Sequence, residues 1–359
     1  MVYGIVPPYL LARIAELDDK KFAHAARSAR RALEQADPMR AARLLFSLDD
    51  DNTLVVEVGD GPNRTISDAA NAETLPGMEV RSEGEEPTGD PAADEAYDGL
   101  GATFALFSEV YKRNSINGAG LPLDATVHYG EDYDNAFWDG ERMVFGDGDG
   151  EIFRRFTISL SVIGHELTHG VTQYTAALEY QGQSGALNES VSDVFGALVE
   201  QYTRNQTAAE ASWLIGEGLF TDEVEGTALR SMKAPGTAYN DDVLGQDPQP
   251  GHLDDYIETD DDNGGVHLNS GIPNHAFYLV AEALGANAWE RAGQIWYDTL
   301  TGPLDTKATF AEFATATIEA AEARYGGSSD EADAVRAGWS GVGVVLEKSG
   351  SQTRSRSTS

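Results

Sequence analysis

The pentapeptide from His165 to His169 has residue types and a spacing that suit metal-dependent hydrolysis. His165 and His169 are four residues apart, so both imidazoles leave the same face of a helix and can bind one ion. Glu166 lies one position further round, beside the ion, where a carboxylate can take a proton from water that the metal activates. The pattern is short, and an amphipathic helix with two buried, hydrogen-bonded histidines is its alternative interpretation.

A pair of acidic residues favours the metal-binding interpretation over the amphipathic helix. Glu189 and Asp193 are also four residues apart and share a helix face, as a third metal ligand and a carboxylate that orients a ligating histidine would. Two imidazoles and one carboxylate favour zinc, because they leave the fourth tetrahedral position open for water. The chain has no cysteine, so thiolate ligands are excluded. Alone, the acidic pair could also be a solvated helix face.

The residues after His169 exclude another class of zinc peptidase. That class has a glycine three residues after the second histidine and a third histidine six residues after it. Here these positions are Thr172 and Thr175.

Two long apolar stripes predict the helices that would carry these side chains. Apolar residues recur every three or four positions from Phe156 to Tyr174 and from Leu187 to Tyr202. Asp90 followed by Pro91 predicts the start of an earlier helix, since Asp caps N-termini and proline fits the first turn. Further helices are expected at 272–284, 289–300 and 308–325.

Short β-prone runs between Thr126 and Gly150 alternate with Asp-Gly turns, which predicts hairpins. The helical and strand patterns together indicate an α+β fold. The remaining expectations are a strand at 54–58, an exposed loop at 78–90, two helices within 8–46 that break near Asp37–Pro38, and a disordered tail after residue 346.

Composition restricts the partners. The formal net charge of the 359-residue chain is −35, which disfavours nucleic acid and anionic membranes because both would repel it. Six Lys accompany nineteen Arg, and an acidic, lysine-poor surface fits a protein that stays soluble at high salt. No apolar run approaches the ~20 residues of a membrane-spanning helix. The oligomeric state is left open, with a monomer favoured.

The N-terminal segment differs in charge from the rest. Residues 1–46 carry eight Lys or Arg and five Asp or Glu, so the remainder carries about −38. Such a basic segment could dock on the acidic body, or it could be a solvated helix pair with no special role. Residues 1–11 lack the pattern of a secretory signal. A cytoplasmic location or a non-classical export route is therefore expected, with secretion as the alternative.

Taken together, the motifs resemble the thermolysin family of zinc metallopeptidases (gluzincins), and in particular its short-prodomain, protealysin-like branch. The segments that carry the resemblance are Asn135–Trp138, His165–His169, Ser184–Asp193, Arg230–Met232 and Asp262–Gly271. They follow the family order across roughly residues 50–345. The resemblance implies a two-domain α+β fold, with a β-rich N-terminal domain, a mainly helical C-terminal domain and the zinc helix between them.

The resemblance also implies roles for individual residues. His165, His169 and Glu189 would bind Zn²⁺, Asp193 would orient His165, and Glu166 would be the general base. Tyr180 and His267 would stabilise the oxyanion, with Asp262 orienting His267, which requires donors aimed at the tetrahedral intermediate.

Substrate contacts are implied in the same way. Asn135 and the Ala136 carbonyl would pair with the substrate backbone as an added strand, and Arg230 would contact the carbonyl just beyond the cleaved bond. Val162 and Leu229 match the apolar pocket for the residue after that bond, although both could equally be plain core. A preference for bulky apolar residues there follows.

Stabilising calcium ions are usual in the family, and here the pattern is incomplete. Glu200 and Glu217 are present, but Ser161, Ser212 and Leu214 stand where further carboxylates are expected. Calcium takes six to eight oxygen ligands. We therefore expect any Ca²⁺ site to be depleted.

The proline-containing start, Ile5–Leu11, resembles the short prodomain of that branch, although an extended arm is the alternative. The implied protein is a zymogen of a neutral zinc endopeptidase that acts on protein or peptide substrates and first on its own prodomain. The expected domains are a prodomain at 1–46, the two catalytic domains at 47–174 and 175–346, and a tail at 347–359. A catalytically silent zinc-binding module and a structural protein that works through its acidic surface remain as other classes.

Overall fold

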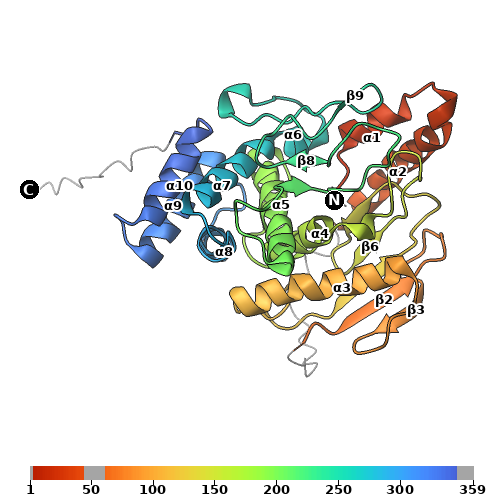
Figure 1. The fold of residues 1–359 in the computed structure, drawn as a ribbon, viewed down its shortest axis with the longest axis horizontal. Coiled ribbons are helices and arrows are strands. Elements are labelled where there is room, and N and C mark those ends of the chain that lie inside the picture. The colour runs from red at the N-terminus through yellow and green to blue at the C-terminus, as the bar shows by residue number, and fades with distance from the viewer. Residues whose placement is uncertain (1–2, 44–60, 346–359) are drawn as a thin grey trace, which may run out of the picture.

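The computed structural model describes residues 3–43 and 61–345 (Figure 1). A six-stranded sheet in the order β1-β5-β6-β4-β2-β3 forms the N-terminal part of the body. It is mixed, because β4 runs parallel to β2 and β6 while the other pairs are antiparallel. Its strands are β1 (Tyr3–Gly4), β2 (Arg64–Asp68), β3 (Met78–Ser82), β4 (Leu123–Val127), β5 (Ala136–Trp138) and β6 (Met143–Phe145).

Helices α4 (Leu160–Gln173) and α5 (Gly182–Arg204) cross the centre of the molecule. Helix α3 (Pro91–Ala105) contacts β2 and β4 on one side and α4 on the other, so it joins the sheet to the central pair. The C-terminal part is mainly helical. It contains α6 (Asp262–Asn269), α7 (Gly271–Leu284), α8 (Ala292–Leu300), α9 (Phe310–Tyr325) and α10 (Asp330–Gly341). Two short two-stranded sheets accompany these helices: β7 (Leu214–Ile215) pairs with β8 (Arg230–Ser231), and β9 (Asn240–Asp241) pairs with β10 (Gly245–Gln246).

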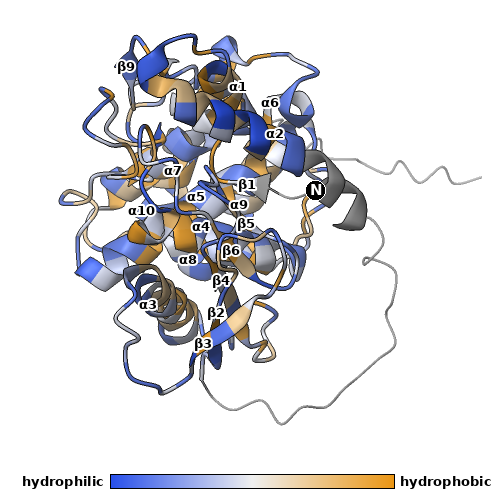
Figure 2. Cartoon of the chain, turned by 90° about the vertical axis from the view of Figure 1, so that its right-hand side faces the viewer, coloured by the Kyte–Doolittle hydropathy of each residue, from blue (hydrophilic) through white to orange (hydrophobic). Residues whose placement is uncertain are grey.

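Helices α1 (Pro8–Ala15) and α2 (Ala23–Arg43) lie on the side of the body opposite α8–α10 (Figure 1). The apolar face of α1 is buried and includes Leu10, Leu11 and Ile14. In contrast, α2 is largely hydrophilic (Figure 2). No helix in the two described ranges is long and apolar enough to cross a membrane.

Several expected elements are confirmed. Asp90 accepts a hydrogen bond from the Ala92 amide at the start of α3, β5 and β6 form a hairpin, and α7, α8 and α9 lie where helices were expected. Thr309 and Glu312 form a reciprocal capping box on α9, which explains its sharp start.

Other expectations are wrong. The zinc helix begins at Leu160 rather than at residue 156, because Phe156–Ile158 form a 3₁₀ turn and Ser159 is extended. Helix α2 runs through Asp37–Pro38, and the break lies between α1 and α2, where Asp19 caps the 3₁₀ turn Lys20–Phe22. Within the expected loop at 78–90, residues 78–82 form β3 because they pair with β2. The expected strand at 54–58, the boundary at residue 46 and the tail lie outside the described residues.

Candidate active site

Two glycines let the central helices approach closely enough to share a site. A Cβ at Gly164 would lie 3.0 Å from the Gly196 Cα, and a Cβ at Gly196 would lie 2.4 Å from the Ser161 carbonyl oxygen. Because neither side chain exists, α4 and α5 pack nearly backbone to backbone. This contact brings the histidines of α4 within reach of the acids of α5.

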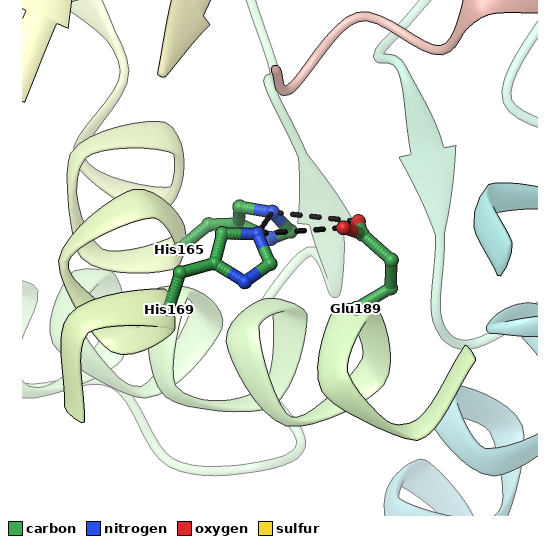
Figure 3. A group of neighbouring side chains, drawn as sticks. All are labelled: His165, His169 and Glu189. Carbon is green, nitrogen blue, oxygen red and sulfur yellow. Dashed lines mark hydrogen bonds and ion pairs between the residues drawn. The ribbon is translucent and has the colours of Figure 1, made fainter. Parts of the chain in front are cut away.

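His165 and His169 project from α4 toward Glu189 on α5 (Figure 3). The two histidine Nε2 atoms are 3.0 Å apart. Glu189 Oε2 lies 3.5 Å from His165 Nε2, and Glu189 Oε1 lies 3.4 Å from His169 Nε2. All three side chains are buried. Within residues 3–43 and 61–345, no other group of three or more His, Cys, Asp or Glu residues is close enough together to hold a metal ion.

The hydrogen bonds of the two rings fix which nitrogen faces the centre. His165 Nδ1 lies 2.7 Å from Asp193 Oδ1, and His169 Nδ1 lies 2.8 Å from Asn188 Oδ1. Each Nδ1 therefore carries the proton, and each Nε2 turns a lone pair toward the other. Burial lowers the pKa of His165 to about 4 although Asp193 opposes the shift, so this ring is neutral as a metal ligand must be.

The carboxylate completes a donor set for a cation. Glu189 Oε2 is buried and has no hydrogen-bond donor within the described ranges. Burial alone would raise the pKa of Glu189, but the positive charge of His267 opposes this, and the pKa lies well below its ordinary value. Two neutral imidazole nitrogens and one anionic oxygen facing a common centre fit Zn²⁺.

Glu166 lies beside this centre. It is fully buried, and its Oε2 accepts a hydrogen bond of 3.0 Å from the Trp138 amide at the end of β5. Strand β5 thus fixes the carboxylate of the residue that directly follows His165 on α4, which suits a general base.

Tyr180 and His267 reach the same centre from the other side. The Tyr180 hydroxyl donates to Glu189 and lies 3.3 Å from His267 Nε2. Asp262 makes two hydrogen bonds with His267, one with ring Nδ1 at 2.7 Å and one with the backbone amide at 2.9 Å. Burial lowers the pKa of His267, but Asp262 and Glu189 outweigh it and raise the pKa to about 9. A left-handed turn over residues 262–265 makes this double contact possible.

Arg230 is fully buried and connects the metal centre to the peptide-binding edge. Its Nε and Nη2 donate to Asp193 at 2.9 and 2.8 Å, while Nη1 donates to the Ile5 carbonyl at 3.0 Å. Asn274 also donates to Asp193, at 2.8 Å. Burial alone would raise the pKa of Asp193, but Arg230 and His165 lower it to about 2. Asn188 and Asn274 are not among the predicted site residues, although Asn188 lies within the motif Ser184–Asp193; no motif includes Asn274.

The N-terminal segment occupies the edge of β5. Strand β1 pairs with β5 in antiparallel register. Ile5 donates to the Ala136 carbonyl at 3.1 Å, and Val6 donates to Asn135 Oδ1 at 2.9 Å. Asn135 and Ala136 thus bind a peptide backbone of the same chain, and their pairing with a substrate stays a prediction. Val162 and Leu229 are fully buried, which fits both a pocket wall and the core, so their role stays a prediction.

The expected calcium ligands do not gather into a similar site. Glu200 Oε1 lies 2.5 Å from Arg204 Nη1. Burial raises the pKa of Glu200, Arg204 lowers it and Glu217 raises it again. A guanidinium therefore supplies the positive charge that this carboxylate requires.

For this reason, calcium chelation is expected to leave the melting temperature of the purified precursor unchanged. An ion that does not bind the folded state cannot stabilise it. Differential scanning calorimetry with EGTA and with added Ca²⁺ would measure this. A melting temperature that rises with Ca²⁺ concentration would show that a site forms despite Arg204.

Comparisons with known proteins agree with this geometry. Family models described as thermolysin metallopeptidase match the chain in two parts, the catalytic domain at 32–173 and the alpha-helical domain at 176–344. An extracellular metalloprotease of Pectobacterium carotovorum subsp. carotovorum is 50% identical over 97% of this chain and 98% of its own. Protease PrtS of Photorhabdus sp. (strain Az29) is 46% identical over 96% and 93%.

A solved structure supports the same assignment. The precursor of protealysin, a metalloproteinase from Serratia proteamaculans, superposes with a TM-score of 0.86 at 51% identity, covering 96% of this chain and 100% of that chain. Both the domain matches and the relatives cover most of the sequence. The chain belongs to the thermolysin family of metallopeptidases.

Proposed function

We propose that this metalloprotease is made as a precursor and hydrolyses internal peptide bonds with Glu166 as the general base. The observation that carries the proposal is the buried convergence of His165, His169 and Glu189 beside the Glu166 carboxylate. When bound there, zinc lowers the pKa of water toward ~7 and polarises the scissile carbonyl.

The protein groups then have separate tasks. Glu166 accepts the proton of the attacking water and passes it to the leaving amine. The Tyr180 hydroxyl and His267 Nε2 are donors on the opposite side, where charge develops on the carbonyl oxygen. Asp193 holds His165 in the tautomer that leaves Nε2 free for zinc, and Asp262 orients His267 so that its Nε2–H can donate.

The contacts of the N-terminal segment support autoinhibition and a subsite assignment. Ile5 is bound through its amide by Ala136 and through its carbonyl by Arg230. The Arg230 contact is the one expected for the carbonyl just beyond the cleaved bond. The Ile5 side chain is fully buried. We assign residues 1–46 as a prodomain that fills the substrate edge, with catalytic domains at 47–174 and 175–346.

Cleavage of casein or a quenched peptide with and without 1,10-phenanthroline tests the proposed function. We expect loss of activity with the chelator and recovery when Zn²⁺ is restored. A silent zinc-binding module would bind zinc without cleavage at any stage. An interaction protein that works through its acidic surface would keep its function after zinc removal.

The subsite assignment predicts specificity. In peptides that differ only after the cleaved bond, replacing Leu or Ile by Gly or Asp is expected to lower kcat/KM about tenfold or more, because an apolar pocket then loses several buried methylenes. Leu229→Ala should shift the preference toward larger side chains if Leu229 lines the pocket, whereas a core role would lower stability alone. Selectivity at the residue before the bond instead would contradict the assignment.

The relatives also bear on location. The Pectobacterium relative is named as an extracellular metalloprotease. We propose that this enzyme likewise acts outside the cell, on protein or peptide substrates. Detection of the processed form in culture supernatant, with a cytoplasmic marker as the control for lysis, would test this.

A further inference from the structure

Two carboxyl groups that are not zinc ligands, those of Asp134 and Asp149, lie close together near α2, because the Gly148 amide donates to the Tyr133 carbonyl at 3.2 Å and sets the two chain segments side by side. Asp134 is 0% exposed and Asp149 is 7% exposed. Asp149 Oδ1 accepts the backbone amides of Glu151 and Ile152, both at 2.6 Å. Asp149 Oδ2 and both oxygens of Asp134 make no hydrogen bond of normal geometry with any donor in the described ranges. Asp149 and the Ser28 hydroxyl both lie near the Asp134 carboxyl group.

Two ionised carboxylates cannot stay together in such a place, because burial and like charge both oppose the second ionisation. Burial raises the pKa of Asp134 well above its ordinary value, and the charge of Asp149 raises it further. Burial also raises the pKa of Asp149, although the backbone amides oppose this. One proton shared between the two, with the charge on Asp149, satisfies both groups.

Among the residues whose side chains the structure describes, no cation neutralises the pair. None of the ion pairs among the described residues joins Asp134 or Asp149 to a Lys, Arg or His. The surrounding charged and titratable groups are engaged elsewhere. The Tyr133 ring packs edge-on against Tyr129 and Phe137. Three acidic neighbours bind α2: Glu131 pairs with Arg31, Asp132 pairs with His24, and Glu151 accepts a hydrogen bond from the Ala25 amide.

The part of the chain that packs over the carboxyl pair is α2, which belongs to the proposed prodomain. Ser28 is 1% exposed, and its hydroxyl donates to the Asp132 carbonyl. Glu151 accepts the Ala25 amide at 2.9 Å in the first turn of α2. Asp134 is also followed directly by Asn135, whose side chain binds Val6. The pair therefore lies where α2 and the inhibitory strand both meet the body.

We propose that Asp134 and Asp149 form a proton-sharing latch that holds the prodomain in place while protonated and loosens it on ionisation. The latch rests on the proposed function only in that residues 1–46 are a removable inhibitor. Undocking exposes the pair to water and returns Asp134 to its ordinary acidity. Docking is therefore strongest at acidic pH and weakens as pH rises through the titration of the docked pair, so self-processing accelerates with rising pH.

Limited trypsinolysis of the full-length Glu166→Gln precursor between pH 6 and 9 tests the latch without relying on its own activity. Cleavage within residues 20–31 is followed by mass spectrometry and normalised to an unstructured reference peptide at each pH. We expect the rate to rise by up to about tenfold per pH unit below the pKa of the docked pair, where undocking releases one proton, and to level off above that pKa. In Glu166→Gln/Asp134→Asn the rate should stay flat, because the amide supplies the donor permanently.

Matched variants separate the latch from general charge effects. Glu131→Gln removes an exposed carboxylate that pairs with Arg31 of α2 and should keep the pH slope. Asp149→Asn should abolish the slope like Asp134→Asn, which gives a second test if one variant folds poorly. Equal slopes in the parent and in both pair variants would overturn the latch.

The active precursor supplies an independent readout. The ratio of self-processing rates of wild type and Asp134→Asn cancels the pH dependence of catalysis itself. We expect this ratio to rise with pH, and a constant ratio would contradict the latch. Failure of the proposed function would instead appear as no chelator-sensitive cleavage by the wild type, whatever the trypsin result.

Discussion

Glu166→Gln is expected to lower kcat/KM by on the order of 10²–10⁴-fold or more, the usual contribution of a positioned general base, while zinc remains bound. The amide keeps an oxygen for the Trp138 N–H, which Glu166 Oε2 accepts at 3.0 Å, but it cannot take a proton. The three proposed zinc ligands are unchanged. A quenched-peptide assay measures the loss, and metal analysis of the purified protein measures the zinc content.

Mass spectrometry of the same variant adds a second readout. Glu166→Gln should keep its full-length mass on incubation, whereas the wild type should lose the prodomain and so reveal the processing site. Glu179→Gln is a matched control on the surface, where its carboxylate lies 3.5 Å from Lys307 Nζ, and it should process normally. Normal turnover of Glu166→Gln would remove Glu166 from the mechanism.

Arg230→Met is expected to lower the free energy of unfolding by about 3–5 kcal/mol, because it leaves a buried carboxylate without its cation. Arg230 donates twice to Asp193, and both side chains are fully buried. Catalysis should fall as well, since Asp193 orients His165. Urea unfolding of the variant in the Glu166→Gln background, which prevents self-processing, measures the stability change.

A second substitution separates the unpaired charge from lost packing. Arg230→Met/Asp193→Asn should regain part of the lost stability, because no buried charge remains, yet it should not regain activity. Arg154→Met is the matched control, since Arg154 pairs with an almost fully exposed Asp222, and exposed pairs contribute about 0–1 kcal/mol. If Arg230→Met were no more destabilising than Arg154→Met, the buried network would not support the fold.

The sequence predicted the site residues best where the chemistry is local. His165 and His169, and likewise Glu189 and Asp193, are brought together by the turn of a single helix, which spacing alone reveals. Asn274 could not be found in this way, because it meets Asp193 across 81 positions of sequence. The same holds for the carboxyl pair, since nothing near Asp134 in the sequence indicates that Asp149 faces it.

The fold shows a similar division. Caps and apolar stripes predicted α3, α5, α7 and α9, because these signals depend on neighbours within one or two turns. The polar sequence of Met78–Ser82 predicts a loop, and the segment forms a strand only because it pairs with β2. The family resemblance supplied the arrangement of the two domains, which periodicity could not.

The pairing of β1 with β5 also depends on covalent connection. While the chain is intact, the covalent connection sets the effective concentration at which the β5 edge meets its inhibitory strand, and dilution does not change it. A cut beyond α2 turns the same contacts into a complex of two molecules, whose occupancy falls on dilution. An enzyme released into a large volume would thus be activated irreversibly, although no contact at the β5 edge had become intrinsically weaker.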